Sequence, residues 1–98
     1  MEIKVEKQDK KCTIVLIGKL DAGTAPQLEE KLDYIPGGLE QLIFDMTELK
    51  YISSAGLRTL LIANDKLEGE GKVTIKGANE MVLDIFNITG FADLLNIQ

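Results

Sequence analysis

The sequence predicts a single α/β domain spanning residues 1–98, with a mixed, mostly parallel sheet of four or five strands and helices packed on it. Three observations lead to this fold class. A chain of 98 residues suits one domain. Its 45% hydrophobic and 28% charged residues fit a protein with a buried core and not a disordered chain. Apolar runs of strand length also alternate with helical patterns, which is typical of crossover units and parallel strands.

The amino-terminal part predicts a β-hairpin. Ile3 and Val5 alternate with charged residues, as in a half-buried strand. The polar residues 8–10 provide a turn, and the apolar run 12–17 provides the second strand. Because this run is nearly continuous, we expect it to be covered on both faces.

A helix is predicted after the hairpin, followed by a central strand. Thr24 and Gln27 have capping-box spacing, with Thr24 as the N-cap. Apolar residues then recur on one helical face at Ala25, Leu28, Leu32 and Ile35. Residues 36–38 end the helix. Residues 42–44 form the strand, and Asp45 is the first residue after it. Asp21 and Asp45 thus each follow a strand. They are either placed at the same edge of the sheet as Ser53 and Ser54 or are solvated loop carboxylates.

The second half predicts a helix, a strand and a third helix. The apolar face of the second predicted helix consists of Leu57, Leu60, Leu61 and Leu67. It is expected to end near residues 68–71, before a strand at residues 73–76. Asn79 is expected to cap the third helix and Gly90 to close it. Residues 91–98 are expected to add a short edge strand. The expected order is strand, strand, helix, strand, helix, strand, helix, with this further strand last.

Composition excludes several classes of function. With a net charge of −5 and no basic stripe, nucleic-acid binding is not expected. The absence of histidine removes a Ser-His-Asp triad and most zinc sites, so we expect no enzyme, metal or cofactor. The single Cys12 cannot form an internal disulfide and is expected in the core. No apolar run reaches the ~20 residues of a membrane span. Residues 1–4 do not read as a signal peptide, so a cytoplasmic protein is expected.

The segment 51–58 is the strongest candidate for function. It is expected to be a loop between a strand and a helix, and it presents Ser53 and Ser54. One of these serines could simply cap the helix. Alternatively, an exposed hydroxyl there could carry a phosphate, because free N–H groups and the helix dipole favour negative charge. Arg58 is either within reach of that phosphate or a solvated helix charge.

Four segments, in order, resemble the STAS domain family (sulfate transporter and anti-sigma antagonist), and most closely its free-standing bacterial anti-sigma factor antagonists. Residues 18–21 resemble the family's G-x-L-D start, and residues 42–46 resemble its central strand. Residues 51–57 resemble its strand–helix segment, and residues 86–91 its F-x-x-x-G-[LF] pattern. The resemblance covers the whole chain. The family's closing helix is expected to be absent or reduced.

The resemblance implies a partner-switching function. In this family an anti-sigma factor serine kinase binds the antagonist, phosphorylates a serine and releases it, and a serine phosphatase reverses the modification. Matching the motif places the phosphoacceptor on Ser54. Ser53 is the second choice, because it stands where the family often has aspartate. The implied contact residues are Asp21, Thr24, Ile52, Ser53, Ala55, Gly56, Leu57 and Arg58. A monomer or weak dimer is expected.

Two other functions stay open at this point. Similar domains serve as small cytoplasmic subunits that brace membrane transporters or hold small ligands. The third possibility is an enzyme, for instance one with weak nucleotide hydrolysis. The lack of histidine, of a phosphate-binding loop and of paired carboxylates argues against it.

Overall fold

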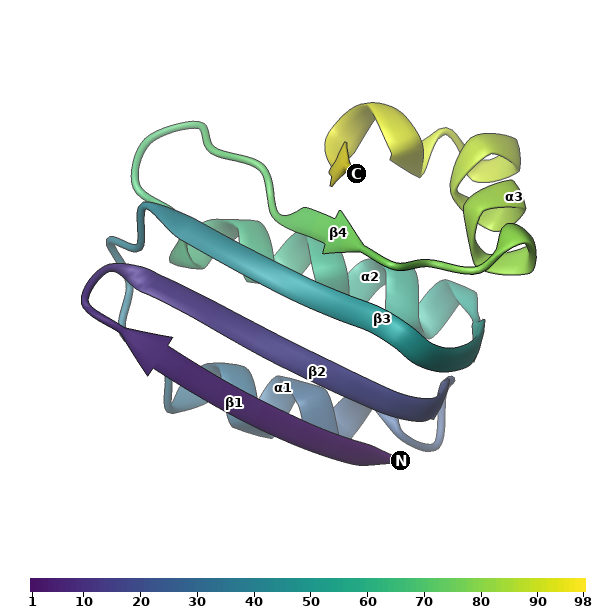
Figure 1. Cartoon of the computed structure of the whole chain (residues 1–98), viewed down its shortest axis with the longest axis horizontal. Coiled ribbons are helices and arrows are strands. Elements are labelled where there is room, and N and C mark those ends of the chain that lie inside the picture. Colours follow the sequence, from purple (N-terminus) through teal and green to yellow (C-terminus); the bar gives the residue numbers. More distant parts are fainter.

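The computed structural model covers all residues 1–98 (Figure 1). Five strands and three helices follow one another along the chain, with two short 3₁₀ turns at Asn64–Lys66 and Phe91–Leu94. They are β1 (Glu2–Gln8), β2 (Lys11–Leu20), α1 (Ala25–Asp33), β3 (Gln41–Ile52), α2 (Ser54–Ala63), β4 (Thr74–Lys76), α3 (Glu80–Thr89) and β5 (Asn96–Ile97). This confirms the predicted order and the short final strand. No helix is both long and apolar enough to cross a membrane.

The five strands form one mixed sheet in the order β1-β2-β3-β4-β5. β1 pairs antiparallel with β2, and each later pair is parallel. The hairpin turns at Asp9, whose φ of 54° lies in the left-handed region that aspartate tolerates. Each parallel connection passes through a helix, as the crossover argument requires.

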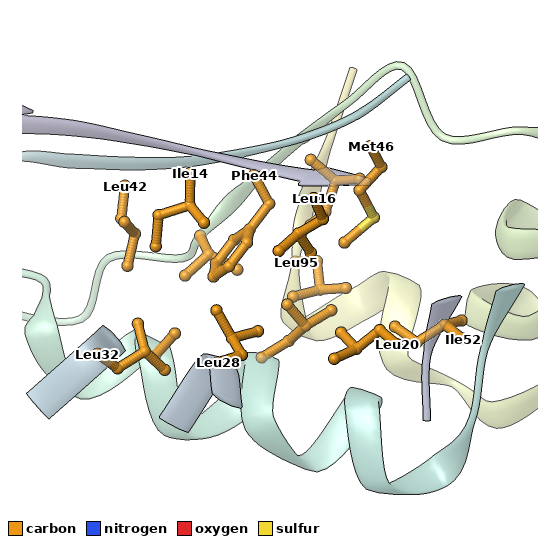
Figure 2. Close-up of a cluster of buried hydrophobic side chains, with 14 of the residues drawn as sticks. Ile14, Leu16, Leu20, Leu28, Leu32, Leu42, Phe44, Met46, Ile52 and Leu95 are labelled. Carbon is orange, nitrogen blue, oxygen red and sulfur yellow. The ribbon is translucent and has the colours of Figure 1, made fainter. Parts of the chain in front are cut away.

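The core lies between one face of the sheet and the helices. In Figure 1, α1 and α2 lie behind the sheet, and α3 lies beyond β4 near the end of β3. Figure 2 shows Ile14, Phe44 and Leu28 among the side chains that fill the space between these layers. In β2, Cys12, Ile14 and Leu16 are buried, whereas their alternating neighbours are only partly covered. The prediction that this strand is covered on both faces is therefore wrong.

β3 is longer than predicted and runs to Ile52. The sequence interpretation ended it at Asp45, which instead lies within the strand, away from the serines. The polar residues after Phe44 belong to a strand with one open face, and the β2–β3 register shifts between Val15 and Ile17. Asp45 accepts hydrogen bonds from the Thr47 hydroxyl at 2.7 Å and the Thr47 amide at 3.0 Å. These bonds lower the pKa of the Asp45 carboxyl.

The helix ends are only partly as predicted. Asn79 caps α3 by accepting from Val82 N at 2.8 Å, and Gly90 closes that helix with a φ of 80°; both predictions are confirmed. α2, however, ends at Ala63 and does not reach Leu67. Leu67 instead forms an isolated parallel bridge with Leu39. Cys12 is fully buried, as predicted, and burial raises the pKa of its thiol.

Candidate functional site

The predicted loop at residues 51–58 is a one-residue junction between β3 and α2. Tyr51 and Ile52 are the last residues of β3, and Ser54 is the first residue of α2. Ser53 N donates to Leu20 O at 2.9 Å, and Ser53 O accepts from Leu57 N at 3.0 Å. Ser53 therefore ends the parallel pairing with β2 and begins the helix at the same point.

The turn between β2 and α1 lies beside this junction. Asp21 Oδ1 accepts from Gly23 N at 3.0 Å and from Thr24 N at 3.1 Å. The Thr24 hydroxyl donates to Lys19 O at 2.8 Å and accepts from Asp21 N at 2.9 Å. Thr24 is at the N-cap position of α1, but its side chain makes no cap bond, so the predicted capping box is wrong. Both side chains instead close and stiffen the turn.

Gly56 allows α2 to begin in close contact with β2 and β3. A Cβ atom at this position would lie 2.7 Å from Leu20 Cγ, 2.8 Å from Ile52 Cγ1 and 2.9 Å from Leu20 O. These distances are shorter than van der Waals contact. A residue without a side chain is therefore required here for close approach, and not for unusual backbone angles.

The two serines differ sharply in exposure. Ser54 is exposed on the first turn of α2. The Oγ of Ser53 has less than 1 Å² of accessible surface and no hydrogen-bond partner. Ser53 occupies the N-cap position, yet its side chain makes no cap bond. A phosphoacceptor must reach the active site of another protein, so the geometry favours Ser54.

The sequence-predicted contact residues fall into two groups. Thr24, Ser53 and Ala55 are partly exposed, as is Asp21, and Arg58 is exposed and forms no ion pair. Ile52, Gly56 and Leu57 are buried, as their places against the core require. The second group can shape the surface but cannot offer a partner much direct contact.

Two contacts that support the site were not predicted from the sequence. Leu20 is fully buried, and its side chain packs directly against Gly56. Its signal was its place as the last apolar residue before Asp21. Asn79 donates from Nδ2 to Leu49 O at 3.1 Å while also capping α3, so it ties that helix to the last part of β3. The cap was predicted from the sequence, but nothing in the sequence indicates the bond to Leu49 O.

The structure contains no cluster of three or more cysteine or carboxylate side chains placed to hold a metal ion. What the junction does offer is a hydroxyl at a helix start. The first amide in the α2 ladder is Leu57 N, and no side chain accepts from the amides before it. Together these features suit a negatively charged group on Ser54.

Comparison with known proteins identifies the family. The chain is 31% identical to the anti-sigma-B factor antagonist of Listeria monocytogenes over 101 residues, which covers 100% of this chain and 87% of that protein. Its fold is similar to that of an anti-sigma factor antagonist from Mycobacterium paratuberculosis, with a TM-score of 0.84 at 22% identity, covering 98% and 83% of the two chains. It also matches the Bacillus cell fate determinant SpoIIAA in its phosphorylated form, with a TM-score of 0.72 at 19% identity, covering 99% and 91%.

The family profile of the STAS domain matches residues 2–98, which is almost the whole chain. The similarity of fold to two anti-sigma factor antagonists and the resemblance of four motifs agree with this match. The chain therefore belongs to the STAS domain family.

Proposed function

We propose that this protein is an anti-sigma factor antagonist, a binding module without catalytic activity that is controlled by phosphorylation of Ser54. Its partner is an anti-sigma factor serine kinase, and a serine phosphatase reverses the modification. The observation that carries this proposal is the exposed Ser54 at the start of α2, beside the Asp21 turn. The name of the Listeria relative supports the same role. The proposal places the protein in the cytoplasm, with the kinase.

In the proposed cycle, the unmodified surface around Ser54 and Thr24 binds the kinase. The Ser54 hydroxyl oxygen attacks the γ-phosphorus of ATP, the bond to ADP breaks, and the serine proton passes to a base of the kinase. The phosphate adds about −1.5 to −2 charges at neutral pH. A surface that bound a partner as a neutral hydroxyl then carries a strongly hydrated anion, and the complex dissociates.

Phosphate mapping tests the proposal directly. We expect that incubation with ATP and each candidate anti-sigma kinase from the same genome modifies Ser54, as located by mass spectrometry of peptides. Ser54→Ala should abolish the modification, and Ser53→Ala should not, because the Ser53 hydroxyl is buried. Modification of neither serine by any of these kinases would refute the switch. Modification of Ser53 alone would refute the assignment to Ser54.

A charge at position 54 should weaken kinase binding. We expect Ser54→Asp to raise the dissociation constant at least about tenfold, since a carboxylate in a contact surface must lose its hydration and a tenfold change needs only about 1.4 kcal/mol. Isothermal titration calorimetry measures this constant.

Two variants control for this effect. Ser54→Ala should bind like the wild type. Gln41→Glu adds the same charge at the exposed start of β3, at the opposite end of that strand, and should leave affinity unchanged. Equal affinity of Ser54→Asp and the wild type would contradict a contact surface at this position.

A further inference from the structure

The start of α2 has a serine at the capping position that does not cap. The Ser53 backbone has a φ of −105° and a ψ of 177°, close to the Asn79 backbone, with a φ of −74° and a ψ of 172°. Asn79 uses this geometry to accept from Val82 N at 2.8 Å. The Ser53 hydroxyl accepts from no amide of its helix, and its oxygen is buried without any partner. The backbone angles of Ser53 would therefore allow a cap, and it is the position of its side chain that prevents one.

This arrangement leaves the amino end of α2 without a resident anion or acceptor. There is no acidic residue in its first turn, whereas α3 has Glu80 there. The amides of Ala55 and Gly56 donate no hydrogen bond to any side chain. Ser54, the exposed first residue of the helix, is attached to the same turn. A phosphate on Ser54 would thus meet unused N–H donors and the positive end of the helix dipole.

We propose that Ser53 is a positioning residue that keeps the first turn of α2 uncapped, so that the phosphate on Ser54 becomes the cap. The Ser53 hydroxyl has no partner and retains a donor proton, which a carboxylate at this position would lack. The phosphate is then fixed on the helix as a dianion at neutral pH. This inference rests on the proposed phosphorylation of Ser54, and it concerns what holds the phosphate once it is present.

The test uses the whole chain with phosphoserine incorporated at position 54 by stop-codon suppression, so that no kinase is needed. The phosphate is titrated by ³¹P NMR between about pH 4 and 9, around its usual second pKa of about 6. Amide proton shifts of Ala55 and Gly56 are followed in the same samples. The reference is an unfolded phosphopeptide of residues 51–58. Charged groups on the elements that meet here include Lys19, Asp21, Glu29, Lys50 and Arg58, and every variant retains all charged residues of the wild type.

In the wild type we expect the second phosphate dissociation constant to be at least about threefold larger than in the peptide, because amide donors stabilise the dianion. The amide protons of Ala55 and Gly56 should move downfield as the dianion forms. Ser53→Asp should remove this gain, since its carboxylate takes the amides and repels the phosphate. The uncharged side chain in Ser53→Asn should accept hydrogen bonds from the amides of Ala55 and Gly56. This variant should therefore lose the downfield shifts and much of the increase in the phosphate dissociation constant. Ser53→Ala, which cannot cap, should keep most of both.

A wild-type phosphate that titrates as in the peptide, with unshifted Ala55 and Gly56 amides, would overturn the inference. The positioning role of Ser53 would also be refuted if Ser53→Asp and Ser53→Asn, shown by circular dichroism to be folded, titrated like the wild type. A different result would refute the proposed phosphorylation switch without refuting the role of Ser53. If no kinase modifies the chain but the incorporated phosphate shows these shifts, the switch is refuted and the positioning role of Ser53 stands.

Discussion

Replacing Gly56 with alanine should lower the free energy of unfolding by about 1–3 kcal/mol, as overpacking of a tight contact does. Helix propensity alone gives the opposite sign, because alanine is favoured over glycine in a helix by about 1 kcal/mol. The contact decides, since the new Cβ would lie 2.9 Å from the Leu20 carbonyl oxygen. That oxygen belongs to the sheet backbone and accepts from Ser53 N, so it cannot turn away. α2 must shift instead.

Urea unfolding followed by circular dichroism measures this loss. Gly37→Ala is the matched control, because nothing lies within 4 Å of a Cβ atom there and its φ is not in the left-handed region. Its unfolding free energy should stay within about 0.5 kcal/mol of the wild type. A Gly56→Ala protein as stable as Gly37→Ala would show that α2 does not pack on β2 as described. Because the shift would displace Ser54, Gly56→Ala should also bind the kinase more weakly.

Replacing Phe44 with alanine should have the largest effect on stability, a loss of about 3–5 kcal/mol. Phe44 is fully buried in β3, the middle strand, and its ring lies between the sheet and the helices (Figure 2). The loss combines the transfer energy of the ring with the cost of the cavity left behind. Since domains of this size have about 5–15 kcal/mol in total, the variant would keep only part of its stability.

The same urea titration tests this expectation. Tyr34→Ala serves as the control, because it also removes an aromatic ring but from a side chain that is 81% exposed. Its stability should differ from the wild type by about 0.5 kcal/mol or less. Comparable losses in the two variants would contradict the placement of the core on this face of the sheet.

Much of this fold could be predicted because local signals agree with the tertiary structure. The hairpin, the Asn79 cap and the Gly90 helix end depend on residues close in sequence, and all three predictions are confirmed. The end of β3 depends instead on pairing with β2 across two register shifts. Its polar residues face solvent on the open side, so periodicity did not indicate a strand. The end of α2 was missed for a similar reason, since Leu67 is buried through a bridge to distant Leu39 and not through the helix.

The candidate site was predicted in part. The sequence placed Asp21 and Asp45 at the edge of the serines, which is wrong for Asp45, and the resemblance added Thr24 as a contact residue. The structure joins the Asp21 turn to the serines through the bond from Ser53 N to Leu20 O. The sequence could not show which hydroxyl is accessible, because neighbouring serines have equal capping propensity. Only packing separates them: one points into the protein and the other into solvent. Packing also shows that Ile52 and Leu57 act from below the surface.

The one-residue junction at Ser53 has a consequence for the thermodynamics of association. A flexible loop would lose conformational entropy when a partner fixes it, and that loss would reduce affinity. Here Ser54 is on a helix, and the Asp21 turn is closed by its own hydrogen bonds. The recognition surface is therefore ordered before any partner arrives, and the entropic cost of ordering falls mainly on the side chains and on the partner. In the proposed switch, a modest contact area would then suffice for binding, and a single phosphate added to Ser54 would end it.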